Sequence, residues 1–154
     1  MAMTKSATGA MTAIQRLLAE EDVNIKDFFV AGASKRGWTT WTTAAVDDRV
    51  RAIAPIVIDL LNIEPSFEHH WRVYGFWSPA IQDYVDMSTT DWWRSAELHT
   101  LFDLVAPLSY RDRYTMPKLI LNAAGDEFFV PTSSQFYYDK LPDEKYLRYV
   151  PNVG

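Results

Sequence analysis

The stretch that decides the fold is FFVAGASKRG, residues 28–37. It opens with a continuous apolar run, Phe28 to Ala31, and such a run without polar alternation is typical of a strand buried on both faces of a sheet. Residues 35–46 follow without a proline, which allows a helix there. Ser34 therefore stands where a buried strand is expected to turn sharply into a helix, a position that projects its hydroxyl above the sheet.

An amphipathic helix is predicted upstream of this stretch. It should end near Asp22, and Thr4 or Ser6 is its candidate N-cap. The prediction rests on apolar residues that recur at three- and four-residue spacing and so share one helix face, namely Met11, Ile14, Leu17 and Leu18.

Three further strands are predicted downstream, at 51–59, 118–122 and 146–150, with a short helix at 132–140. Pro55 lacks a backbone donor, so the strand at 51–59 should be irregular there. Alternation of strands and helices implies parallel strands joined by right-handed crossovers. The predicted fold class is therefore α/β, with a mainly parallel sheet and flanking helices.

Residues 61–108 differ from the rest of the chain because they are rich in aromatic side chains. Breaks at Pro65, Pro79 and Pro107 predict short helices joined by loops. We interpret this segment as a cap inserted over the carboxyl edge of the sheet, within a single domain that spans residues 1–154. Most of its aromatic residues should form a small core of the cap, with one or two facing a substrate cleft: Trp71, Tyr74, Trp77, Trp92 and Trp93.

Composition excludes several classes of function. The net charge is −5, which disfavours nucleic acid as the main partner because a phosphate backbone requires a basic surface. The chain has no cysteine, so disulfides, thiolate metal sites and cysteine nucleophiles are excluded. No apolar stretch approaches the roughly 20 residues of a membrane span. We expect neither a cofactor nor a metal ion.

Ser34 is the candidate nucleophile, and the N–H of Lys35 is a candidate donor to an oxyanion. The usual pattern for a serine on such a turn is Gly-x-Ser-x-Gly. Here Arg36 takes the place of the last glycine, and Gly37 comes one residue later. The alternative, an ordinary Gly-Ser turn between strand and helix, remains open on the local pattern alone.

Asp126 is the candidate acid, because it follows the predicted strand at 118–122. It also comes after Ser34 in the chain, which is the order of nucleophile and acid in α/β folds of this kind. Carboxyl ends of parallel strands are where α/β folds place their chemistry. A Gly-Asp pair is also common in turns, so a plain turn carboxylate is the competing interpretation. Glu127 and Asp59 remain alternative acids.

The general base of a catalytic triad should lie on the loop after the last strand, here after residue 150. All three histidines, at positions 69, 70 and 99, precede Asp126. We therefore expect the base to be missing from residues 1–154. Two adjacent histidines without a clear third ligand are weak support for a metal site, so His69 and His70 are interpreted as surface or core residues. His99 is expected to have a structural role in a helix.

Several longer strings resemble the family of PhoPQ-activated pathogenicity-related proteins, which includes autocrine proliferation repressors. The resemblance runs from about Thr4 to Gly154. It is carried by AGASKRGWTTW (31–41), IVIDLLN (56–62), YGFWSPA (74–80), YRDR (110–113), MPKLI (116–120), NAAGDEFF (122–129) and KYLRYVPN (145–152).

The resemblance implies an α/β-hydrolase fold in which Ser34 matches the nucleophile and Asp126 the acid. It also implies an exported protein, and it places this chain as the C-terminal core of a longer one whose histidine follows residue 154. Acyl transfer on an ester or an amide is the expected chemistry of an intact relative, with this chain nearly inactive by itself. The substrate stays open. The rival expectation is a non-catalytic secreted binding protein built on the same scaffold.

Overall fold

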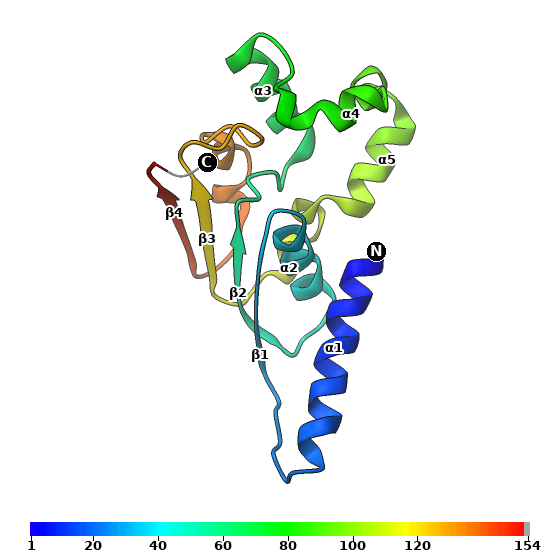
Figure 1. The fold of residues 1–154 in the computed structure, drawn as a ribbon, viewed down its shortest axis with the longest axis vertical. Coiled ribbons are helices and arrows are strands. Elements are labelled where there is room, and N and C mark those ends of the chain that lie inside the picture. The colour runs from blue at the N-terminus through cyan, green and yellow to red at the C-terminus, as the bar shows by residue number, and fades with distance from the viewer. Residues whose placement is uncertain (153–154) are drawn as a thin grey trace.

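The computed structural model describes residues 1–152, and its centre is a four-stranded parallel sheet (Figure 1). Its strands are β1 (Phe28–Ala33), β2 (Val50–Ile56), β3 (Lys118–Ala123) and β4 (Lys145–Val150), and they lie side by side in chain order. Each neighbouring pair is parallel, which confirms the predicted α/β class. The carboxyl ends of all four strands consequently lie at one edge of the sheet. The loop expected at 151–154 extends into residues 153–154, which lie outside the described residues.

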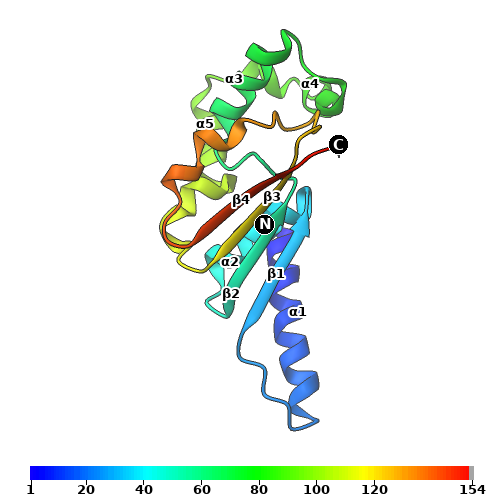
Figure 2. The same cartoon turned by 90° about the vertical axis from the view of Figure 1, so that its left-hand side faces the viewer.

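Two helices, α1 (Ala2–Ala19) and α2 (Lys35–Val46), cover one face of the sheet, while Figure 2 shows the opposite face open. Three large side chains on different strands are exposed there: Phe29 (65%), Leu119 (42%) and Tyr146 (56%). Leu119 and Tyr146 are direct neighbours in the β3–β4 register. Parallel sheets in α/β proteins are usually covered on both faces.

Self-association of this chain through an exposed edge of the sheet is a further prediction from the sequence, because an unpaired edge strand can pair with another chain. It stays a prediction, and the open apolar face adds exposed area that favours association. We expect light scattering to report a species larger than one chain, because exposed apolar area favours association. A monomer that also binds no apolar dye would contradict this expectation.

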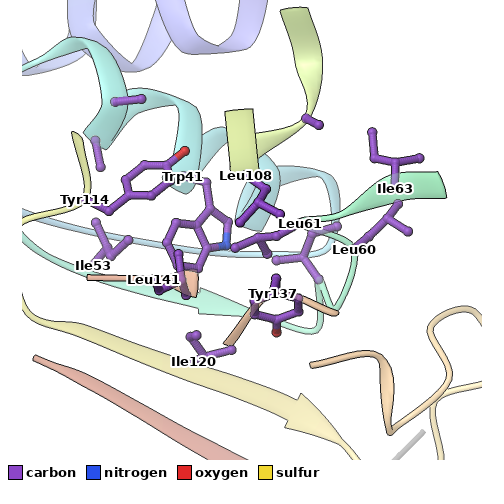
Figure 3. Close-up of a cluster of buried hydrophobic side chains, with 14 of the residues drawn as sticks. Trp41, Ile53, Leu60, Leu61, Ile63, Leu108, Tyr114, Ile120, Tyr137 and Leu141 are labelled. Carbon is purple, nitrogen blue, oxygen red and sulfur yellow. The ribbon is translucent and has the colours of Figure 1, made fainter. Parts of the chain in front are cut away.

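The main core lies between the sheet and the helices, and Figure 3 shows how its side chains meet. Trp41 of α2 is completely buried, and its ring lies edge-on to Tyr114 with 4.9 Å between centroids. Ile53 of β2 and Ile120 of β3 face the same cluster from the sheet. These residues are carried by elements far apart in the sequence, so this core joins helix, sheet and loops into one unit.

The first helix differs from its prediction at both ends. It begins at Ala2 and ends at Ala19, so neither Thr4 nor Ser6 caps it. The Thr4 hydroxyl lies 2.7 Å from that of Thr42 on α2, whereas Ser6 donates to the carbonyl of Ala2 in its own helix. Thr4 therefore contacts a second helix instead of capping its own.

The predicted apolar face of α1 is buried only at Met11. Ile14 and Leu17 are 44% and 61% exposed. The helical period was predicted correctly, but only Met11 of this face is buried in the core, while Ile14 and Leu17 stay largely exposed.

Strand β2 confirms the irregularity expected at Pro55, on the side that faces β3. Ile53 donates to the carbonyl of Pro117, and Val57 donates to that of Leu121. Pro55 lies between these two donors and has no N–H to give. The strand ends at Ile56 rather than at Asp59, because Val57 adopts a positive φ of 44°. Positive φ is a genuine outlier for a β-branched residue.

The short helix predicted at 132–140 is wrong. The structure has two 3₁₀ segments instead, η4 (Ser133–Phe136) and η5 (Tyr138–Lys140). Tyr137 separates them with a φ of −143°, outside helical geometry. Its ring is fully buried and its hydroxyl donates to Asp59, so burial of one side chain overrides the local helical pattern.

The segment predicted as a cap forms short helices beyond the carboxyl edge of the sheet (Figure 1). They are α3 (Ile63–Tyr74), η1 (Pro79–Ile81), α4 (Gln82–Asp86), η2 (Thr89–Trp92), α5 (Ala96–Val105) and η3 (Pro107–Arg113). Pro79 and Pro107 begin helices as expected, but Pro65 lies inside the first turn of α3 and does not interrupt it, because a proline is tolerated there.

The aromatic side chains of the cap form a cluster around Phe67. Its ring meets those of Trp77, Tyr84 and Trp93 with centroid distances of 5.0 to 6.3 Å in edge-to-face geometry. Trp71 is 47% exposed and Trp92 is 58% exposed. Within residues 1–152, no helix combines the length and the apolar character needed to cross a membrane.

Candidate active site

Ser34 occupies a strained turn between β1 and α2. Its φ is 53° and its ψ is −124°, so a residue with a side chain adopts a backbone that usually requires glycine. Two backbone hydrogen bonds hold this conformation: the Ser34 N–H donates to Ile56 at 2.8 Å, and Trp38 donates to the Ser34 carbonyl at 3.0 Å. Strain of this kind costs about 1–3 kcal/mol and is concentrated at functional sites.

Two glycines let the chain close this turn. A Cβ on Gly32 would lie 2.7 Å from the carbonyl oxygen of Arg36, which is backbone and cannot move aside. A Cβ on Gly37 would lie 2.8 Å from the side chain of Ile58 and 3.0 Å from the carbonyl oxygen of Ile56. Gly37, one residue beyond its usual place, thus brings the first turn of α2 directly onto β2. Arg36 fits in the usual glycine slot because it is exposed.

Lys35 is the first residue of α2. The first N–H groups of a helix have no partner within it, and they lie at the positive end of the helix dipole. The Lys35 N–H is therefore suitably placed to donate to a negatively charged oxygen close to Ser34.

Asp126 lies in the turn after β3, at the same edge of the sheet as Ser34. One of its oxygens, Oδ1, accepts hydrogen bonds from the N–H groups of Phe128 and Phe129, both at 2.9 Å. These bonds fix the carboxylate, and Oδ2 has no hydrogen-bond partner within residues 1–152. The neighbouring Glu127 is exposed.

The histidines serve other contacts. His70 is buried on α3, and its Nε2 accepts a hydrogen bond from Ser78 at 3.0 Å. Burial lowers the pKa of His70 below its ordinary value, which favours the neutral ring that this bond requires. The Nε2 of His69 lies 2.7 Å from the hydroxyl of Thr132. Within residues 1–152, no imidazole hydrogen-bonds to Ser34 or Asp126, and no group of three metal-ligating side chains gathers.

His99 lies on α5 and is 47% exposed. Its Nδ1 lies 3.6 Å from a carboxylate oxygen of Glu64 on α3. This contact joins two helices of the cap, which agrees with a structural role.

Asp59 lies in a buried polar cluster that the sequence did not indicate. Its two carboxylate oxygens accept hydrogen bonds from Tyr137 and Tyr149, each at 2.5 Å. Tyr149 also lies 3.0 Å from the hydroxyl of Ser134. The buried amide of Asn122 adjoins both tyrosines without ordinary hydrogen-bond geometry to either. The cluster ties the loop after β2 to β4 and to the segment after β3.

Burial raises the pKa of Asp59 from 3.8 to about 6, and the two tyrosine hydrogen bonds offset only part of this effect. The folded chain therefore binds a proton on Asp59 more tightly than the unfolded chain does. This contribution to the free energy of unfolding is fully present below pH 3.8 and is lost as pH rises to about 6. A difference of about two pKa units corresponds to about 3 kcal/mol.

We expect Asp59→Asn to remove this pH dependence. Asparagine can accept from Tyr137 and donate to Tyr149, so the variant should be more stable than the native chain at about pH 7.5, with a smaller difference at about pH 4.5. Urea denaturation at both pH values measures the effect. Asp112→Asn, at a carboxylate whose side chain is 91% exposed, is the control. An equal change in stability at both pH values would contradict the prediction.

A parallel sheet in the order β1-β2-β3-β4, with a strained serine after β1 and a fixed carboxylate after β3, defines the class of protein as the α/β-hydrolase fold. Solved structures agree. An acetyl xylan esterase from Paenibacillus sp. R4 matches 93% of this chain and 45% of its own, at a TM-score of 0.64 and 15% identity. An acylaminoacyl peptidase from Pyrococcus horikoshii matches 98% of this chain and 23% of its own, at a TM-score of 0.65 and 16% identity.

The chain belongs to the family of PhoPQ-activated pathogenicity-related proteins, whose family model matches residues 1–154. Autocrine proliferation repressor protein A of Dictyostelium discoideum is 44% identical over 153 residues, which are 98% of this chain. The chain spans about a third (31%) of the length of that relative. The family expected from the sequence strings is thereby confirmed.

Proposed function

We propose that this chain carries the nucleophile and the acid of a serine hydrolase that transfers acyl groups from esters or amides. The observation that carries the proposal is the backbone of Ser34, whose positive φ places a hydroxyl at a strained strand-to-helix turn. The likeness to esterases and peptidases supports the proposal with a hydrolase-like scaffold.

In the proposed reaction, Ser34 Oγ bonds to the substrate's carbonyl carbon while an imidazole takes the hydroxyl proton. The carbonyl oxygen becomes an oxyanion, to which the N–H of Lys35 donates. The imidazole then gives its proton to the leaving group as the bond to that group breaks. Water next cleaves the acyl-serine ester by the same steps. None of the three histidines hydrogen-bonds to Ser34 or Asp126, so we place the imidazole outside residues 1–152, as the family resemblance implies.

Asp126 is better suited than Asp59 to orient that imidazole. Both oxygens of Asp59 already accept hydrogen bonds from tyrosine hydroxyls, and the residue is only 2% exposed. Asp126 is held through Oδ1 alone and is only partly buried, so Oδ2 can accept an imidazole N–H. Within residues 1–152, the Glu127 carboxylate accepts no comparable backbone hydrogen bonds, and the residue is exposed.

A serine-reactive phosphonate tests the proposal on the protein at its natural full length. We expect one covalent adduct, and peptide mass spectrometry should locate it at Ser34, because only a serine activated by a base attacks such a probe quickly. Asp126→Asn should slow this labelling strongly, whereas Asp112→Asn should not. Absence of any adduct at Ser34 would overturn the proposal.

A second candidate function is a non-catalytic binding protein. The name of the Dictyostelium relative, a proliferation repressor, favours this alternative. Trp71, Phe76 and Trp92 on the cap are about half exposed and would suit a protein interface. If the phosphonate leaves Ser34 unmodified in folded protein, this alternative gains support.

A further inference from the structure

An apolar cavity of about 230 Å³ lies within the cap, next to the start of α2. Its walls come from α2, from the loop after β2, and from α3, α4, η2 and α5. Phe67, Trp93 and Phe102 contribute aromatic surfaces, and each of these rings meets the next in edge-to-face geometry. These contacts give the cavity a defined shape.

The chemistry of the lining is almost entirely apolar. The lining residues with polar side-chain atoms are Trp38, Tyr84, Thr89, Thr90 and Trp93, and burial raises the pKa of the Tyr84 hydroxyl above its ordinary value. The indole N–H of Trp38 is already used, because it donates to the carbonyl of Val105 at 2.8 Å. An apolar cavity of about 150 Å³ is known to stay dry and bind benzene, so this larger one suits an apolar group rather than water.

The cavity adjoins the nucleophile through Trp38. Trp38 lines the cavity with its side chain, and its backbone N–H donates to the carbonyl of Ser34. Ser34 directly precedes α2, so Trp38 lies in the first turn of the helix that follows the candidate nucleophile.

The cavity also adjoins the loop of the candidate acid. Phe128 donates to Asp126 through its N–H, and its ring meets that of Tyr84 with 6.1 Å between centroids. Tyr84 lines the cavity. The cavity is therefore linked to Ser34 through Trp38, which lines it, and to Asp126 through Phe128, which packs against the lining residue Tyr84.

We infer that this cavity binds an apolar group on the acyl side of the substrate, such as an alkyl chain of medium length, and so sets the substrate class. The inference rests on the proposed function, because it assumes that Ser34 attacks the carbonyl carbon. An acyl group attached to Ser34 Oγ would pass Trp38 into the cavity, and water would be excluded from its walls.

Two phosphonate probes that differ only in their alkyl arm, methyl or hexyl, test this inference on the protein at its natural full length. Each labelling rate at Ser34 is divided by the rate at which hydroxide hydrolyses that probe. We expect the hexyl probe to react at least about tenfold faster, because even one methylene in an apolar pocket is worth about tenfold or more. The p-nitrophenyl esters of hexanoate and acetate should show the same preference in kcat/KM.

Thr89→Phe should fill the cavity and reduce the hexyl preference to near one, while labelling by the methyl probe persists. Thr100→Phe is the matched control, since Thr100 is exposed on α5 and does not line the cavity. Leu101→Trp, at a lining residue that is 48% exposed, is a second narrowing variant in case Thr89→Phe does not fold.

The outcomes separate this inference from the proposed function. Fast labelling of Ser34 by both probes at equal rates would overturn the inference and leave the hydrolase proposal standing. Absence of labelling by either probe would overturn the hydrolase proposal. A hexyl preference that Thr89→Phe and Leu101→Trp leave unchanged would show that another surface binds the chain, which also overturns the inference.

Discussion

Alanine in place of Ser34 should reduce ester hydrolysis by the protein at its natural full length by about 10⁴-fold or more, a loss typical of removing a catalytic serine. The reason is that the acyl group would have no oxygen to bond to, while the Lys35 N–H and the apolar cavity would still bind the substrate. The folded state should persist, because alanine at a φ of 53° carries the same kind of backbone strain as serine. Release of p-nitrophenol from a hexanoate ester measures the change.

Ser6→Ala is the control for this experiment, since Ser6 is exposed on α1 and bonds only within its own helix. It should leave the rate unchanged. Thermal unfolding of both variants confirms that each is folded. If Ser34→Ala retained most of the native rate, hydrolysis would have to come from another nucleophile, and the assignment of Ser34 would be wrong.

Trp41→Ala should lower the free energy of unfolding by about 3–5 kcal/mol. Trp41 has no exposed surface, and it lies at the centre of the core in Figure 3, against Tyr114. Its removal would leave a cavity between α2 and the sheet that rigid neighbours fill poorly. Urea denaturation followed by circular dichroism measures the loss, and a chain that no longer unfolds cooperatively would count as the extreme of the same effect.

Trp92→Ala is the matched control, because the side chain of Trp92 is 58% exposed. A surface substitution of this kind should change stability by less than about 0.5 kcal/mol. Equal losses in the two variants would mean that the core does not depend on Trp41 as its burial indicates.

The sheet could be predicted because its strands are encoded locally. The apolar runs around Val30 and Ile120 are continuous, and Ser34 and Asp126 follow such runs. The candidate nucleophile and the candidate acid could therefore be chosen from the sequence. The sharp turn was predicted as well, and the structure gives Ser34 a positive φ of 53° there. Continuous runs predict strands buried on both faces, and that part of the prediction is wrong in the described residues, because Phe29 is 65% exposed and Leu119 is 42% exposed on the open face.

The buried cluster at Asp59 could not be predicted in the same way. Its hydrogen-bond partners Tyr137 and Tyr149 lie 78 and 90 positions further along the chain, so no local pattern links them. The same contact explains the wrong helix at 132–140, because Tyr137 leaves helical geometry to reach Asp59. Local propensity is a weak guide wherever one buried side chain gains more from a distant partner than from its own helix.

The displaced glycine of the serine turn has a consequence for recognising such turns in other sequences. What the turn requires is a residue without a Cβ where α2 crosses β2, and Gly37 meets that requirement although it stands three positions after Ser34 rather than two. A search for letters at fixed spacing would pass over this chain. A rule based on contact distances would accept Gly-x-Ser-x-x-Gly as a second sequence pattern with the same backbone geometry. It would also allow a charged residue such as Arg36 at the position directly before the second glycine.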